Sequence, residues 1–474
     1  MQEGGIFQRH HRITHEEKEI SPKASQGIAG GVPPDRPRRG WGGGVSHGWR
    51  ALRHRNFRLF FSGQSVSLIG TWMTRLATSW LVYQLTGSAL WLGVVGFAGQ
   101  IPTFFLAAVA GVWVDRLNRR QVLVWTQALA AVQSLALAAL TLSHRITILE
   151  IVLLSVFQGL INAFDMPGRQ AFLTEMVEGP EDLGNAIALN STMVNLARLV
   201  GPSLAGLIIA GFGEGYCFLI DGMSYFAVIA SLLAMRMNAA PVKRAAASMV
   251  EQLKEGWAYV SGFAPVRTIL LIFALASLMG MPYSVLMPIF ASRVLHGGAH
   301  TLGFLMGAAG VGALVSAVSL ALRKTVLGLG RMIPIAFATF GAGLVLLGLS
   351  HVLWLSLLVM LPIGFGMMQG MASSNTIIQT VVPEDRRGRV MSYYTMAFVG
   401  MAPFGSLLAG ALAHLLGAPR TVMITGSVLI AGSIVFATRL KEIRRLIRPI
   451  YEEKGILPPS LTPAAEDIGG AAPM

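Results

Sequence analysis

The sequence is poor in cysteine and in charge. Cys217 is the only cysteine in 474 residues, so neither an intrachain disulfide nor a cysteine-based metal site can form. Charged residues make up only 13% of the chain, whereas 53% are hydrophobic and the mean hydropathy is +0.60. One or two soluble domains could not bury that much apolar surface, and the composition therefore predicts an integral membrane protein.

Several chemical signatures are also missing. We find no HExxH zinc motif, no nucleophile elbow, no histidine cluster within an apolar run and no nucleotide-binding loop. We therefore expect no enzyme, no ATP-driven pump, no metal and no cofactor. The net charge of +14 lies in loops and tails between apolar runs, which is typical of orientation signals and argues against nucleic-acid binding.

What the sequence does contain is a regular series of apolar runs of about 20 residues, the length that an α-helix needs to cross a bilayer. They predict an all-α integral membrane fold with twelve transmembrane helices, at residues 57–83, 88–114, 121–143, 146–167, 184–211, 216–237, 266–292, 302–323, 329–350, 352–376, 390–416 and 421–439. An even number of spans places both termini on one side of the membrane.

The charges between the spans orient the chain. On one side, the only lysine or arginine residues in the loops are Arg145, Arg293 and Arg420. The loops on the other side contain the basic segments 50–58, 116–120, 236–254, 323–331 and 386–389. The positive-inside rule makes this second side cytoplasmic. Both termini are then cytoplasmic.

These spans imply five regions. Residues 1–49 are polar, lack the apolar core of a signal peptide and are predicted to be a disordered cytoplasmic arm. A six-helix bundle at 50–237 and another at 266–439 flank a cytoplasmic linker, 238–265, in which 249–260 has the spacing of an amphipathic helix. Residues 440–474 are expected to form a basic helix at 441–448 and an unstructured tail.

The two halves also resemble each other. Short matches recur in the same order about 200 residues apart: Gln158-Gly159 with Gln369-Gly370, Pro180-Glu181-Asp182 with Pro383-Glu384-Asp385, and Gly201-Pro202 with Ala402-Pro403. Together they indicate a duplicated six-helix unit with a cavity between the halves near the middle of the bilayer.

The most informative stretch is GVWVDRLNRR at 111–120, which fits the pattern G-x-x-x-D-R-x-x-R-R. Gly111 would let two helices approach closely, Asp115 could cap a helix or form an ion pair, and Arg116, Arg119 and Arg120 would lie in a short loop at the membrane edge. The stretch resembles the loop between helices 2 and 3 of the major facilitator superfamily. The alternative is an ordinary positively charged loop.

Further stretches strengthen this resemblance: GQSVSLI at 63–69, LTGSA at 85–89, DMPGRQA at 165–171, ARLVGPSLAG at 197–206 and LID at 219–221. Over residues 57–439 the chain is similar to bacterial efflux proteins of that superfamily, in the branch of enterobactin exporters and macrolide pumps. The resemblance implies two pseudo-symmetric bundles that rock around a central site, in the inner membrane of a bacterium and as a monomer. It implies proton-driven export of a siderophore or a drug by antiport, and hence drug resistance.

Two motifs bear on the mechanism. Ala197, Gly201, Pro202 and Gly206 approximate the antiporter motif of drug exporters and could form a hinge, although a bent packing helix would have the same residues. Ser155 stands where proton-coupled members have the arginine of R-x-x-Q-G. A proton relay therefore cannot be assigned to that position.

Ionisable residues within the spans cost at least about 2.5 kcal/mol each to insert, so each needs a partner or a cavity. Arg198 lies about 21 Å along its span, at 1.5 Å per residue, and is our strongest candidate for a cavity charge, with a buried structural ion pair as the alternative. Arg75 is a second substrate candidate, unless it extends toward the outer headgroups. Asp221 is a substrate or proton candidate or else structural. Asp165 beside Arg169 favours a cytoplasmic gate pair with the 111–120 loop.

Several uncharged side chains could line the cavity or merely hold helices together. They are Gln64, Asn162, Gln369 and Asn375, followed by Gln100, Asn190, Asn195, Met281, Tyr283, Tyr393 and Tyr394.

We thus predict a proton-driven exporter of a small amphipathic molecule. Its loop at 111–120 would act as an inner latch, in which Asp115 pairs with a cation or caps the span at 390–416 when the outer side is open. An importer on the same fold is the main alternative, followed by a non-transporting receptor or scaffold.

Overall fold

The structure, a computed structural model, describes residues 49–458 except 178–179, 237–248 and 324. Nearly all of the predicted N-terminal arm, the part of the predicted linker before residue 249 and the C-terminal tail after residue 458 therefore lie outside the described residues. Within the described part, every regular element is a helix. The described residues form one packed unit, and the division into bundles at 50–237 and 266–439 stays a prediction.

Each predicted span corresponds to a long helix or a broken helix. The first half contains, after the short helix η2 (Arg50–Arg53), α2 (Arg55–Thr86), α3 (Ala89–Arg116), α4 (Arg119–Leu142), α5 (Ile148–Leu173), α6 (Pro180–Phe212) and α7 (Glu214–Ala234). The second half contains α9 (Ala264–Leu275) with η3, α10 (Tyr283–Ile289) and η4, then α11 (Ala299–Ala321), α12 (Leu329–Leu349), α13 (Leu353–Val381), α14 (Glu384–Thr395) with η5 and α15 (Met401–Leu416), and α16 (Ala418–Thr438).

Eleven of these helices are long and apolar enough to cross a membrane. The twelfth, α2, carries Arg75 within its length and packs against α6 and α7. Large apolar side chains point outward from the described surface: Trp354 is 80% exposed and Trp125 is 69% exposed. Such side chains suit a surface that contacts lipid rather than water. The prediction of an all-α membrane protein with twelve helices is confirmed.

The helix ends follow local sequence signals. Thr147 and Glu150 form a reciprocal capping box at the start of α5, which satisfies two free backbone donors. The side chain of Asn118 accepts a bond from the backbone N–H of Gln121 at the start of α4. Gly87 ends α2 with a φ of 58°, a conformation that glycine adopts without strain.

Some helix ends differ from the predicted ones. α5 continues through Pro167 to Leu173, and α14 begins at Glu384 rather than at residue 390. Apolarity was the sequence criterion for a span, whereas backbone hydrogen bonding continues after the side chains become polar. The arginines near these helix ends therefore lie within the helices, which are longer than the predicted apolar spans.

Three π-helical segments interrupt the spans of the second half: η3 (Ala276–Gly280), η4 (Phe290–Val294) and η5 (Met396–Gly400). η3 and η5 contain the residues four positions before Pro282 and Pro403. Proline has no N–H and its ring crowds the carbonyl four residues earlier, so a widened turn relieves the clash. Periodicity in the sequence gave no sign of these segments.

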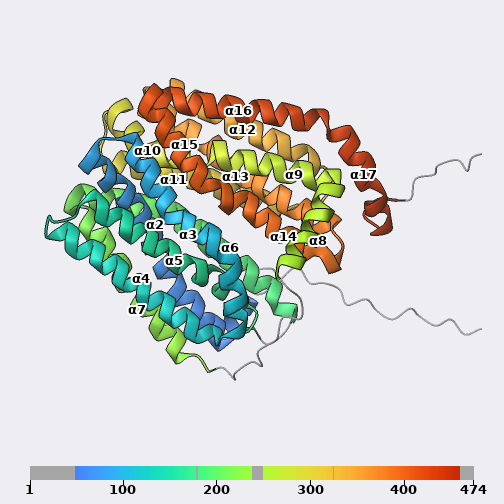
Figure 1. The fold of residues 1–474 in the computed structure, drawn as a ribbon, viewed down its shortest axis with the longest axis horizontal. Coiled ribbons are helices and arrows are strands. Elements are labelled where there is room, and N and C mark those ends of the chain that lie inside the picture. Colours follow the sequence, from blue (N-terminus) through green and yellow to red (C-terminus); the bar gives the residue numbers. More distant parts are fainter. Residues whose placement is uncertain (1–48, 178–179, 237–248, 324, 459–474) are drawn as a thin grey trace, which may run out of the picture. The chain divides into compact units, whose positions relative to one another are not determined.

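Figure 1 shows the helices of residues 55–234 grouped together and those of residues 264–438 grouped together. In the first group α2 packs on α7, α3 on α5 and α4 on both α5 and α7; in the second, α12 packs on α13 and α16, and α11 on α13. The two groups meet mainly where α6 packs on α11 and α3 packs on α15.

Two pairs of glycines lie where the two groups of helices meet, and we call each pair with its contacts a clasp. In the α3–α15 clasp, a Cβ atom on Gly93 would lie 2.7 Å from the carbonyl oxygen of Ser406, and one on Gly410 would lie 2.8 Å from that of Ala89. Only a residue without a side chain permits so close an approach.

The α6–α11 clasp repeats this pattern with the same four-residue spacing. A Cβ on Gly303 would lie 2.8 Å from the carbonyl oxygen of Pro202, and one on Gly206 would lie 2.8 Å from that of Ala299. The contacts between the halves thus show the same internal symmetry as the sequence. In these contacts Pro202 takes the place that Ser406 has in the other clasp. The sequence matches had paired Pro202 with Pro403 instead, because they compare residue types and not helix packing.

Both clasps lie toward one end of the unit, at the ends of α3, α6, α11 and α15 that are far from the arginine-rich loops. We call it the clasped end.

Two further helices belong to the second half: α8 (Met249–Gly262) packs on α14 and α9, and α17 (Leu440–Glu453) buries Ile443, Ile447 and Tyr451. Arg389 of α14 lies 2.6 Å from Glu255 of α8. That α8 and α17 rest on a membrane surface stays a prediction.

Candidate substrate cavity

A cavity of about 390 Å³ lies between the two halves. Residues of α2 to α6 line it from the first half, and residues of α10, α11, α13 and α15 from the second. Pro202 and Ser406, which belong to the clasps, are also part of its lining. The clasps therefore close the cavity toward the clasped end.

Two arginines line this cavity and share one aromatic ring. The guanidinium carbon of Arg75 lies 4.9 Å from the ring centroid of Trp72, and that of Arg198 lies 5.1 Å from the same centroid. Both contacts are within the range of a cation–π interaction. Trp72 also lines the cavity, so the three side chains form one cationic surface from α2 and α6.

Neither arginine forms a direct ion pair in the described part of the chain. Among the described residues, no aspartate or glutamate forms an ion pair with Arg75 or Arg198, and the Nε atom of Arg198 is buried without a hydrogen-bond partner. The head group of Arg75 lies in the cavity lining and not at a helix end. The structural ion pair considered for Arg198 and the outward extension considered for Arg75 are thus both absent from the described part.

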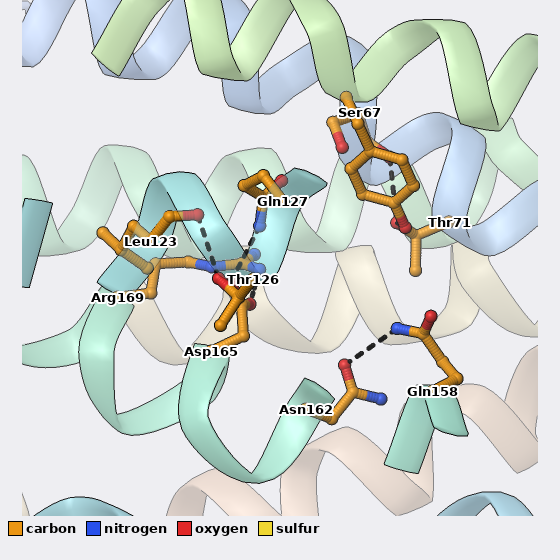
Figure 2. Close-up of polar contacts among 10 residues, drawn as sticks. Ser67, Thr71, Leu123, Thr126, Gln127, Gln158, Asn162, Asp165 and Arg169 are labelled. Atoms are coloured by element: carbon orange, nitrogen blue, oxygen red, sulfur yellow. Dashed lines mark hydrogen bonds and ion pairs between the residues drawn. The ribbon is translucent and has the colours of Figure 1, made fainter. Parts of the chain in front are cut away.

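The rest of the lining is uncharged. In the described chain, no acidic residue contributes to it. Amides supply hydrogen-bonding groups: Gln158 donates to Asn162 over 3.2 Å, as Figure 2 shows, and the buried Oε1 atom of Gln158 has no partner. Met281, Met306 and Met367 are among the apolar lining residues. The cavity thus combines fixed positive charge with amides and soft apolar surface.

Sequence reasoning found part of this lining. Arg75, Arg198, Asn162, Gln100, Met281 and Tyr283 belong to it, and so does Ser155, which replaces the motif arginine. It missed Trp72, Gln133, Met306 and Met367, because a tryptophan, glutamine or methionine in an apolar run looks the same whichever way it faces.

Other candidates lie elsewhere. Gln369 of α13 accepts a bond from Ser316 of α11 over 3.0 Å, and this bond joins the two helices. Gln369 also donates to Ser373 on its own helix. Asn375 accepts from Gln379 one turn along the same helix. The bond from Ser316 favours the helix-packing alternative for Gln369, and in the described chain neither Asn375 nor the buried Gln64 lines the cavity.

The residues of the antiporter-like motif lie where helices approach closely. A Cβ on Gly201 would clash with Trp72 of α2, and Gly206 and Pro202 are in the α6–α11 clasp. Ala197 is buried, and α6 runs unbroken through Pro202. Close packing explains the small residues, and a hinge at Pro202 stays a prediction.

The stretch at 111–120 is tied to the first half, but it is mostly helical. α3 runs to Arg116 and α4 begins at Arg119, so only Leu117 and Asn118 remain of the predicted loop. Arg119 lies 2.5 Å from Glu175 at the end of α5, and Arg120 donates to the carbonyl of Leu233 at the end of α7. A Cβ on Gly111 would meet no described atom within 4 Å, so the close helix approach predicted there is absent. The side chain of Asp115 lies outside the described part, and the latch stays a prediction.

Asp165 and Arg169 form an ion pair one turn apart on α5. Asp165 is only 3% exposed and also accepts bonds from Thr126 over 3.0 Å and Gln127 over 2.7 Å, both on α4 (Figure 2). Its described partners are thus on α4 and α5, where Thr126 and Gln127 lie across from it between packed helices. The predicted gate pairing with the stretch at 111–120 stays a prediction.

We expect Arg169→Ala to destabilise the protein by about 3 kcal/mol or more, because it leaves the buried Asp165 carboxylate without its cation. Thermal unfolding in detergent, followed by tryptophan fluorescence, measures this. Glu255→Gln, which removes the half-exposed pair with Arg389, is the control and should cost at most about 1 kcal/mol. Equal losses in the two variants would contradict the structural role of the Asp165 pair.

Comparison with known proteins identifies the chain. Residues 46–448 match the sequence family described as transmembrane secretion effectors. The chain belongs to the major facilitator superfamily. Its resemblance at the level of motifs is therefore confirmed, and this major facilitator protein is a multi-pass membrane transporter and not an enzyme.

Characterised relatives of this major facilitator protein are distant but of similar length. The staphyloferrin A transporter of Staphylococcus aureus is 26% identical over 80% of the chain and 95% of that protein. The multidrug efflux pump Tap of Mycolicibacterium fortuitum is 28% identical, with the same two coverages.

Solved structures share the fold. A nucleoside transporter superimposes with a TM-score of 0.63 at 14% identity, over 82% of this chain and 99% of that one. A POT family transporter in complex with a thioalcohol-conjugated peptide gives a TM-score of 0.65 at 13% identity, over 82% and 96%. At these identities the likeness concerns the fold alone.

Proposed function

We propose that this major facilitator protein is a proton-driven exporter of small, anionic, amphipathic molecules. The observation that carries the proposal is the pair of guanidinium groups on Trp72, in a cavity whose described lining has no acidic residue. Siderophores with acidic groups and anionic drugs are molecules of this class.

Electrostatics favours an anion. A guanidinium binds a carboxylate or phosphate through two parallel hydrogen bonds, and it does so most strongly where water is partly excluded. Arg75 and Arg198 form no ion pair with a described residue, and charge without a direct partner is costly within a membrane. An anionic ligand would supply the missing charge and contact the Trp72 ring at the same time.

The rest of the cavity suits an amphipathic molecule of modest size. Its volume of about 390 Å³ is within the usual range of about 300–1,000 Å³ for small-molecule sites. Methionine side chains are flexible and polarisable, so Met281, Met306 and Met367 could adapt to different apolar groups. These features support a substrate class defined by charge and amphipathic character rather than by one fixed shape.

Export is the direction that we propose. One relative is named an efflux pump, and the matching family is described as secretion effectors. If the arginine-rich loops face the cytoplasm, the clasped end faces outward, and the cavity is ready to take substrate from inside. Breaking the clasps while the inner ends close would then release substrate outside by alternating access.

Everted membrane vesicles test charge and direction together. With an acid interior, we expect vesicles containing the protein to accumulate an anionic dye such as carboxyfluorescein. We expect no accumulation of a cationic dye of similar size such as ethidium. Collapse of the proton gradient should stop accumulation, and vesicles without the protein are the control. Preferred transport of the cation would contradict the anionic class, and accumulation only in right-side-out vesicles would indicate an importer.

A further inference from the structure

Asp221 is a buried carboxylate in the middle of the first half. It lies on α7 and is 1% exposed. Its Oδ2 atom accepts bonds from the hydroxyls of Thr74 on α2, over 2.8 Å, and Ser134 on α4, over 2.9 Å. Three helices of the first half therefore meet at one carboxyl group.

The second oxygen of this carboxyl group is less well satisfied, although the hydroxyl of Tyr225 on the same helix also interacts with the carboxyl group. Oδ1 is buried without a hydrogen-bond partner among the described residues. It faces the backbone of Gly70, where a Cβ would lie only 2.7 Å away. A buried carboxylate oxygen without a donor is unfavourable when ionised, whereas an attached proton removes the charge.

Asp165 provides the contrast within the same bundle. Both of its oxygens have partners, namely Arg169, Thr126 and Gln127. Asp221 has hydroxyl donors on one oxygen and no described ion pair. The groups that face it are Thr74 and Ser134 from α2 and α4, Tyr225 from its own helix, and Arg75, the cation that acts on it through space. Of the two buried aspartates in the described chain, Asp221 is the one whose contacts suit a group that gains and loses a proton.

Asp221 is also next to the cavity without lining it. Its donor Thr74 is itself a lining residue and precedes Arg75, and its donor Ser134 follows the lining residue Gln133. Because Thr74 both lines the cavity and donates to the carboxyl group, it offers a short path for a proton. Arg75, the next residue on α2, interacts with the carboxyl group and belongs to the proposed anion site.

From these contacts we propose that Asp221 is the proton-binding site of this transporter and exchanges its proton with the cavity beside Thr74. The step is simple: a proton from cavity water forms an O–H bond on the Asp221 carboxyl, and the same bond breaks when the proton returns to water. The inference rests on the proposed proton coupling, and it locates that coupling away from the helix motif in which Ser155 replaces arginine.

Solid-supported membrane recordings test this site with the proton as the only ligand. A pH jump on proteoliposomes without substrate should produce a transient current from proton binding. We expect Asp221→Asn, which mimics the protonated side chain, to lose at least about nine-tenths of this charge movement. Glu255→Gln, at an exposed pair on α8, is the control and should keep it. A full current in a folded Asp221→Asn protein would overturn the proposal.

A second pair of variants separates proton binding from a merely structural role. Thr74→Val and Ser134→Ala each remove a hydroxyl that stabilises the ionised carboxylate. Each should therefore move the pH of half-maximal charge movement upward by about one unit. An unchanged midpoint in both variants would contradict the assignment. Because no substrate is used, a failed dye-transport experiment and a failed proton-binding experiment remain distinguishable.

Discussion

Replacing Arg75 and Arg198 together by glutamine should weaken the binding of an anionic substrate at least about 100-fold. A hydrogen bond to a charged group contributes about 1.5–3 kcal/mol, and each tenfold change in affinity corresponds to about 1.4 kcal/mol. Two such bonds account for a loss of that size. The measurements are the concentration dependence of anionic dye transport and quenching of tryptophan fluorescence by the dye.

The double variant should fold normally. Removing two cations that form no described ion pair relieves the cost of burying them, and this offsets the lost contacts with Trp72, so the thermal unfolding temperature should stay the same or rise. Arg145→Gln removes an exposed arginine from a loop and is the matched control. Unaltered affinity in the double variant, or an equal loss in the control, would contradict the anion site.

The second large effect concerns the clasped end. We expect the double variant Gly93→Ala, Gly303→Ala to shift the population away from the clasped state at least about 30-fold. Each added methyl would lie within 3 Å of a carbonyl oxygen on the opposite half, and overpacking of this kind costs about 1–3 kcal/mol per site. Dye transport should fall at the same time, because the cycle must pass through the clasped state.

Distances between spin labels measure this shift directly. Cys217→Ser gives a cysteine-free background, and the exposed residues Leu149 on α5 and Leu415 on α15 can then carry labels on opposite halves. The label distance should increase in the double variant. Gly211→Ala lies on α6 just beyond Gly206, where a Cβ meets no described atom within 4 Å, and it should leave the distance unchanged. Identical distances in all proteins would refute the clasps as the closing contact.

The architecture was predictable because lipid imposes a simple rule. Every backbone polar group in a span must be satisfied within its own helix, so length and apolarity reveal the spans. The same rule says nothing of what happens past the membrane edge. For that reason α5 continues past its predicted end to include Arg169, and α14 begins at Glu384, before its predicted start. The π-helical turns before Pro282 and Pro403 were missed because side-chain periodicity hardly changes over five residues.

The site was less predictable, and the reason is again physical. Charge in hydrocarbon is rare enough that Arg75 and Arg198 could be selected from sequence. Their shared contact with Trp72 could not, since it depends on how α2 and α6 are rotated. Amides are ambiguous for the same reason: Asn162 faces the cavity and Gln369 faces a neighbouring helix, although both lie in similar apolar runs.

At the clasp glycines the halves meet through backbone and glycine Cα atoms, and beside them Phe404 of α15 packs edge-on against Phe97 and Phe104 of α3. Dispersion forces between such surfaces have a very short range, and a gap of about 0.5–1 Å already forfeits a quarter to a half of the attraction. A half-separated clasp would thus keep little of its stability. The closure acts as a contact that is either made or lost, so the halves should part abruptly rather than by gradual loosening.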